Sequence, residues 1–106
     1  MAKGKRRRRK RADESEARTV LATRLSALRR LTYGELVDRF LGKVETEETV
    51  AASGRWYQIE IQGFWDSRPG GNLRVMGSID EGKGWRAFKP LTDDFIIAPD
   101  GSFVGE

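Results

Sequence analysis

The sequence predicts one α+β domain in which two N-terminal helices pack on one face of an antiparallel β-meander of about four to five strands. After Gly42 the hydrophobic period changes from the 3.6 residues of a helix to the 2 residues of a strand. Short turns separate the strand candidates, which favours antiparallel neighbours. The 94 residues from 13 to 106 suffice for a single hydrophobic core. We therefore expect one domain over residues 13–106, preceded by a disordered basic segment over residues 1–12.

Both expected helices have recognisable starts. Acidic residues crowd the beginning of residues 13–30, where the helix dipole favours them, and an apolar stripe follows at steps of three and four residues. This stripe consists of Ala17, Val20, Leu21, Leu25 and Leu28. The second helix is expected to start with a capping box between Thr32 and Glu35 and to end at Gly42 with a left-handed cap.

The rest of the chain is predicted to form strands. Residues 44–51 form a weak candidate, and residues 55–65 a strong one, because apolar and polar residues alternate there. In the strong strand the apolar face carries Tyr57, Ile59, Ile61 and Trp65. Further strands are expected at residues 72–80, 85–88 and 95–98, and, after the turn at Pro99-Asp100-Gly101, at Phe103 and Val104.

The charge of the chain is divided between its two parts. The first twelve residues hold eight of the twenty Lys and Arg residues and no acid, so the remainder has twelve cations against sixteen acids. The whole chain is therefore +4 and the domain −4. Cations at this density repel one another, which predicts disorder, and they can neutralise phosphates of a nucleic acid. The residues expected to do so are Lys3, Lys5, Arg6, Arg7, Arg8, Arg9, Lys10 and Arg11.

Other roles for the basic segment stay open at this point. It can act as a solubilising tail or lie on the acidic surface of its own domain. An anionic membrane surface ranks lower as a partner, because the segment has no Leu or aromatic residue to insert.

Three stretches of the C-terminal half have a distinctive sequence: Tyr57-Gln58-Ile59-Glu60-Ile61-Gln62, Pro69-Gly70-Gly71-Asn72-Leu73-Arg74-Val75 and, above all, the stretch from Pro90 to Glu106, PLTDDFIIAPDGSFVGE. In these stretches the chain resembles a family of small bacterial domains of unknown function. This resemblance implies a bacterial, cytoplasmic setting and contributes no catalytic residue. The basic segment lies outside the similar region.

Two aromatic residues are expected on the polar face of the strong strand. Trp56 and Phe64 alternate with the apolar residues and so join Glu60 on that face, with Arg74 of the next strand as a cross-strand partner of Glu60. These four residues form the predicted partner surface. Cover by the strand at 44–51 or by the chain end is the alternative. The aromatic motifs of RNA-recognition sheets are not in the sequence.

The residue types argue against catalysis and metal binding. Cys and His are both absent, which removes disulfides, thiolates, imidazole bases and the commonest metal ligands. Asp93 and Asp94 are adjacent in a strand and should point to opposite faces. We therefore expect no enzyme, no cofactor and no metal. A pocket lined by two or more convergent carboxylates would argue against this expectation.

The composition also bears on location. No apolar run approaches the ~20 residues that span a bilayer, and the basic segment runs into acids rather than into a signal-peptide core. We expect a cytoplasmic protein without a membrane span.

Two functions from different classes fit this pattern. The first is a non-enzymatic protein whose basic segment contacts nucleic acid electrostatically. The alternative is a protein-interaction module, like an antitoxin or an immunity protein, that uses the exposed sheet face. The oligomeric state and the choice between RNA and DNA stay open.

Overall fold

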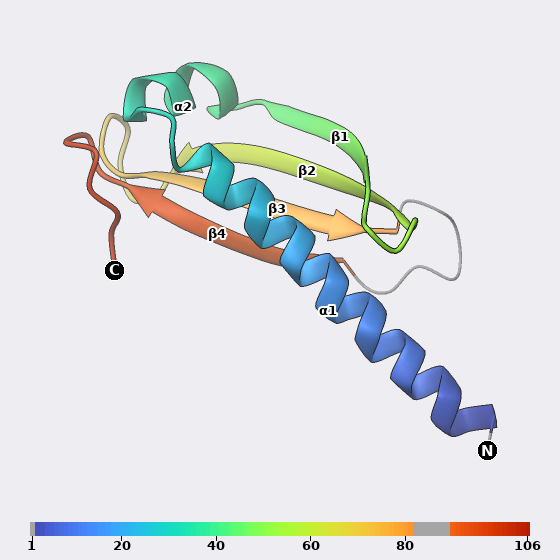
Figure 1. Cartoon of the computed structure of the whole chain (residues 1–106). Helices are drawn as coiled ribbons and strands as arrows, with labels where there is room; N and C mark the ends of the chain where they lie inside the picture. The colour runs from blue at the N-terminus through green and yellow to red at the C-terminus, as the bar shows by residue number, and fades with distance from the viewer. Residues whose placement is uncertain (1, 82–89) are drawn as a thin grey trace.

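The computed structural model describes residues 2–81 and 90–106, and for residues 2–13 the backbone alone. Its elements are α1 (Ala2–Leu28), α2 (Tyr33–Phe40), β1 (Val44–Val50), β2 (Trp56–Trp65), β3 (Leu73–Asp80) and β4 (Leu91–Ile97). The four strands form one antiparallel sheet in the order β1-β2-β3-β4, and the helices lie over one face of it (Figure 1). The predicted α+β fold is confirmed. The expected strand at 85–88 lies outside the described residues.

Helix α1 is longer than the sequence predicts. It begins at Ala2 instead of residue 13, so the backbone of residues 2–12, which we expected to be disordered, continues the helix past the end of the sheet (Figure 1). Two physical effects favour this extension. Lys and Arg have high helix propensity. Adding turns to a helix that is already packed also avoids the cost of nucleation.

Helix α2 has the predicted start. The Glu35 N–H donates to Thr32 Oγ1 at 3.1 Å, and the Thr32 N–H donates to Glu35 Oε1 at 2.9 Å. At the other end the left-handed cap expected at Gly42 is confirmed only in its backbone angle, a φ of 68°. The helix is capped by Leu41, whose backbone is extended, and the Gly42 N–H donates to the Gly63 carbonyl of the sheet at 3.1 Å. Gly42 therefore serves a turn, closed by the Lys43 N–H and the Phe40 carbonyl at 3.0 Å, that leads the chain into β1.

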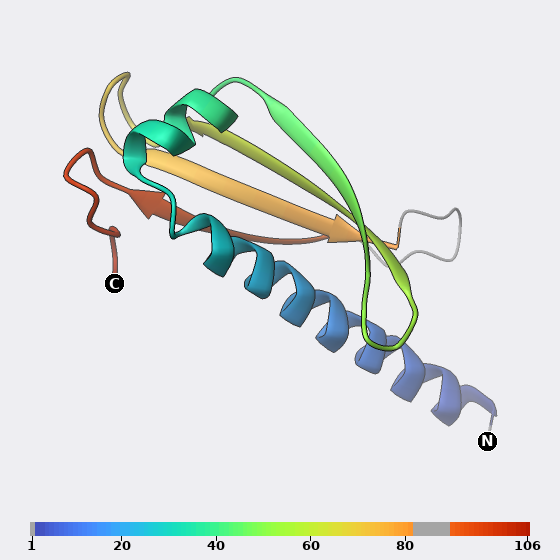
Figure 2. The same cartoon turned by 45° about the horizontal axis from the view of Figure 1, so that its top comes forward.

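The sheet has one buried and one open face. Along β2 the residues alternate as predicted: Tyr57, Ile59 and Ile61 are buried under the helices, and the residues between them lie on the other face. Strand β3 repeats this alternation with buried Leu73, Val75, Gly77 and Ile79. Both helices lie on the buried side of the sheet (Figure 2). The opposite face is called the outer face below.

The chain end differs from the prediction. Phe103 and Val104 were expected to form a strand, but they make a single β-bridge, between Phe103 and Ile97, and one hydrogen bond from the Val104 N–H to the Ile96 carbonyl at 2.9 Å. Gly105 follows directly with a φ of 83°. This left-handed turn ends the pairing before a second bridge can form.

A close approach between α2 and β2 depends on Gly63. A Cβ added at this position would lie 3.0 Å from the Phe40 Cβ and 3.2 Å from the Phe40 carbonyl carbon. Neither atom can move without the helix, because Phe40 is fully buried. The absence of a side chain at Gly63 therefore allows the end of α2 to rest on the sheet.

We expect the substitution Gly63→Ala to lower the free energy of unfolding by about 1–3 kcal/mol, because the added methyl overpacks the interface between α2 and β2. Urea unfolding followed by tryptophan fluorescence measures the change. The matched control is Gly34→Ala in α2, where a Cβ meets nothing within 4 Å. It should leave stability unchanged or raise it by up to about 1 kcal/mol. Equal destabilisation of both variants would contradict this role of Gly63.

Candidate functional site

The basic segment forms the free end of α1. Its eight cations occupy positions 3 to 11, which in an α-helix is about 12 Å of axis at 1.5 Å per residue. This end points away from the sheet, and α2 and the β2–β3 connection lie at the opposite end of the molecule (Figure 1). The arrangement separates the largest concentration of positive charge from the acidic domain.

The rest of α1 is held firmly against the sheet. Ala17, Leu21, Leu25 and Leu28 are all buried, as their spacing predicts. Near the base of the basic segment Glu16 accepts hydrogen bonds from Ser53 Oγ at 2.7 Å and from the Tyr57 hydroxyl at 2.9 Å, which join α1 to the β1–β2 hairpin. These bonds, the one from Ser53 above all, lower the pKa of Glu16. The basic segment therefore extends from an anchored helix.

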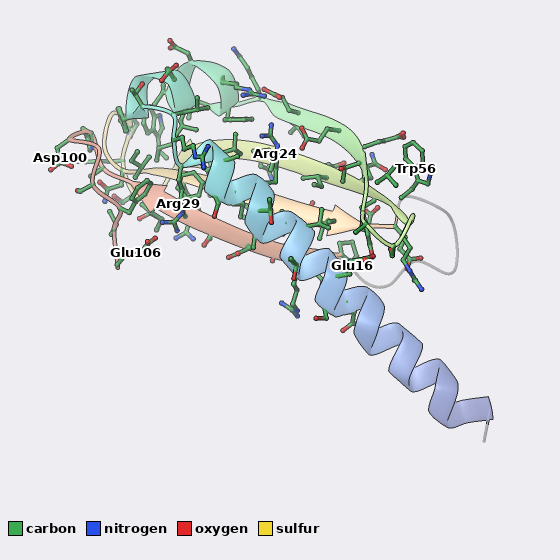
Figure 3. All side chains as sticks on the ribbon, viewed as in Figure 1. Glu16, Arg24, Arg29, Trp56, Asp100 and Glu106 are labelled. Atoms are coloured by element: carbon green, nitrogen blue, oxygen red, sulfur yellow. The ribbon has the colours of Figure 1, made fainter. Side chains whose placement is uncertain are left out.

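The predicted partner surface is divided by the geometry of the sheet. Trp56 and Phe64 lie on the outer face as expected, with 53% and 37% of their surface exposed. They stand at the two ends of β2, eight residues or about 27 Å apart. Figure 3 shows Trp56 at the hairpin end of the sheet, far from Glu106 at the other end. A single compact partner cannot use both aromatics unless it covers the whole strand.

The predicted pairing of Arg74 with Glu60 is wrong. In the observed register Glu60 lies opposite Ser78, and Arg74 lies opposite Phe64. Arg74 instead donates to Asp66 at 2.7 Å and also to Asp94. The cause is the register of β2 and β3, which places Arg74 four positions along the strand from Glu60. Of the four predicted residues, the fold brings only Phe64 and Arg74 together.

A cluster that the sequence analysis missed holds the chain end. Arg29 donates to both carboxylate oxygens of Glu106 at 2.5 Å, and its guanidinium lies over the rings of Phe95 and Phe103 at 5.1 and 4.7 Å. Arg29 and Glu106 lie close together in Figure 3. The hydrogen bonds from Arg29 lower the pKa of Glu106. No local pattern signals this interaction, because 77 residues separate its two ends.

A pocket beside this cluster has the acidic lining that would argue for an enzyme. It has a volume of about 280 Å³ and is lined in part by Asp93, Asp94 and Glu106. Each carboxylate already has a structural partner: Asp93 accepts the Asp94 N–H, Asp94 binds Arg74, and Glu106 binds Arg29. The lowered pKa of Glu106 is the opposite of what a general acid near neutral pH requires. The pocket thus supplies no catalytic argument, and the absence of enzymatic activity stays a prediction.

Within residues 2–81 and 90–106 no group of three or more acidic, His or Cys side chains is arranged to hold a metal ion. In the same part of the chain no helix is long and apolar enough to cross a membrane.

Comparison with known proteins returned no match among protein-family models, curated proteins or solved structures. The resemblance of the C-terminal half to a family of bacterial domains therefore stays a prediction.

The anchor at Glu16 should make stability depend on pH. Because the folded state lowers the pKa of this carboxylate, its ionised form stabilises the fold above the ordinary pKa of Glu, and this contribution is lost as the pH falls through the folded pKa. The substitution Glu16→Gln keeps the shape and removes the charge. Wild type should be more stable than this variant at about pH 7, and the difference should shrink towards about pH 3.

Urea unfolding at both pH values measures that difference. The control is Glu60→Gln, an exposed position with no ion pair or hydrogen bond in the described part of the chain. It should show no comparable change. A pH-independent effect of Glu16→Gln would contradict the role of the charge.

Proposed function

We propose that the protein is a non-enzymatic nucleic-acid binder in which a basic helical segment projects from an acidic α+β domain. One observation carries the proposal: eight cations with no acid among them continue a helix whose other end is buried in the core. A cytoplasmic location, compatible with a chain that lacks cysteine, is part of the same proposal.

The expected interaction is with the phosphate backbone. Duplex DNA carries one negative charge per about 1.7 Å of axis, so a short basic helix meets many phosphates, and binding releases condensed counterions. Interactions of this kind position a protein on the nucleic acid without reading base sequence. The domain itself has a net charge of −4 and should repel the same polyanion, so the basic segment must supply the attraction.

The helical backbone of residues 2–12 supports this proposal in a second way. A segment that is already helical loses less conformational entropy on binding than a disordered one. A helix also has the diameter that the major groove of a duplex admits. The anchored part of α1 then determines how the domain stands relative to the nucleic acid.

Replacing three of the cations should weaken binding in a predictable way. We expect the variant carrying Arg6→Gln, Arg7→Gln and Arg8→Gln to bind mixed-sequence DNA and RNA oligonucleotides more weakly. The slope of log K against log salt should become smaller by about 3, because each phosphate that an arginine neutralises contributes about 0.9 to the slope on duplex DNA. Fluorescence anisotropy of labelled oligonucleotides over a range of salt concentrations measures both quantities.

The control variant also removes three positive charges, but from the end of the domain opposite to the basic segment. Arg30→Gln, Lys43→Gln and Arg68→Gln change exposed cations with no ion pair among the described residues. This variant should keep at least most of the affinity and the original slope. Equal weakening in both variants, or negligible binding by wild type at low salt, would refute the proposal.

A second candidate function belongs to a different class. Phe64 is exposed on the outer face beside Arg74, which supports a protein-interaction module that binds a partner there. If this is the function, Phe64→Ser should abolish recovery of one stoichiometric protein from the native host, whereas the triple variant of the basic segment should retain it. Recovery that Phe64→Ser leaves unchanged would exclude this surface.

A further inference from the structure

One edge of the sheet offers unpaired backbone groups. Among the strands of residues 2–81 and 90–106, β1 pairs with β2 only, and it forms one end of the strand order. At the hairpin the Ala51 N–H donates to the Arg55 carbonyl at 2.9 Å, so the odd-numbered residues of β1 direct their backbone groups towards β2. The N–H and C=O groups of Val44, Thr46, Glu48 and Val50 consequently point away from the sheet.

The opposite edge, β4, is protected. The Asp94 N–H, which points outward, is occupied by the Asp93 carboxylate at 2.8 Å. Further along the strand the outward Ile96 carbonyl accepts the Val104 N–H. Capping and covering are common ways in which proteins prevent an edge from pairing with another chain. Within the described residues no other segment or side chain hydrogen-bonds to the outward backbone groups of β1, so that its three glutamates are its only protection. This asymmetry makes β1 the candidate interface.

The sequence of β1 is complementary to itself when two copies run antiparallel. If Glu47 lies opposite its own copy, Val44 faces Val50, Thr46 faces Glu48, and Glu45 faces Thr49. The even-numbered pairs join residues with free backbone groups and form the hydrogen-bonded pairs. The odd-numbered pairs form the non-hydrogen-bonded ones, so the register satisfies the alternation of an antiparallel ladder.

This register covers exposed apolar surface. Val44 and Val50 are 58% and 48% exposed, and both lie on the outer face. Trp56, 53% exposed, is the neighbour of Val50 across the β1–β2 ladder. Three of the five large hydrophobic residues that the described chain exposes would thus lie at or next to the contact between the two β1 strands.

The charges on β1 are compatible with the pairing. In this register Glu45 and Glu48 face threonines, to which a carboxylate can hydrogen-bond. The one pair of like charges that lies directly opposite is Glu47 with its copy. Each Glu47 accepts a hydrogen bond from Arg24 at 2.7 Å, which reduces the repulsion between them.

We propose that two copies of the chain associate through β1 about a two-fold axis at Glu47, which joins the two four-stranded sheets into one of eight strands. The axis is perpendicular to the sheet, so both α1 helices lie on the same face and both basic segments are presented on that side. The dimer does not depend on nucleic-acid binding.

Sedimentation equilibrium of the full chain, after nuclease treatment and in high salt, tests the proposal without bridging nucleic acid. Wild type should show a monomer–dimer equilibrium. The substitution Val44→Lys should raise the dissociation constant about tenfold, because it removes both valine pairs of the dimer. Val104→Lys changes a valine of similar exposure, 40%, at the other edge and should have no effect.

A reciprocal variant tests the register. Because residue 44 faces residue 50 of the other copy, Val44→Lys combined with Val50→Glu should restore much of the association that either change alone removes. Thr46→Pro should also abolish the dimer, since it deletes an outward N–H that the monomer does not use. Far-UV circular dichroism confirms that each variant is folded.

Three results would overturn the proposal. The first is a wild type that stays monomeric at its highest soluble concentration. The second is a dimer that Val44→Lys and Thr46→Pro leave intact while folded. The third is a double variant that associates no better than the single ones.

Discussion

The structure depends on the burial of one apolar stripe of α1 against the sheet. Leu21 and Leu25 pack over Gly77 of β3, where an added Cβ would lie 2.8 Å from Leu21 Cδ1. This close packing sets the direction of the helix across the strands. It thereby determines where the basic segment leaves the domain, and it brings Arg29, which directly follows α1, to Glu106.

In the described part of the chain the helices cover one face of the sheet, which leaves its outer face and its edges as possible surfaces for a partner. The outer face separates Trp56 from Phe64 and so offers two small apolar areas instead of one. The edges differ: outward backbone groups of β4 are hydrogen-bonded, whereas no described residue bonds to those of β1. A dimer through β1 would cover the Trp56 area and leave the Phe64 area available, so the two proposals about protein partners do not compete for the same residues.

Structural features that depend on residues near one another in sequence were predicted well. The capping box of Thr32 and Glu35 and the alternation along β2 follow from local hydrogen bonding and local periodicity, and the structure confirms them. The candidate surface was predicted only in part. Trp56 and Phe64 were placed on the correct face, because alternation alone decides the face of a residue.

By itself the sequence determined the fold class, the faces of the strands and the separation of a basic segment from an acidic domain. Tertiary structure alone decided the partners: Arg74 with Asp66 and Asp94, Arg29 with Glu106, and the open state of β1 beside the capped β4. The physical reason is that periodicity is local, whereas these interactions depend on strand register and on where the chain returns after long separations. Tertiary structure also decided the conformation of the basic segment, because a helix that is already packed on the sheet extends into it.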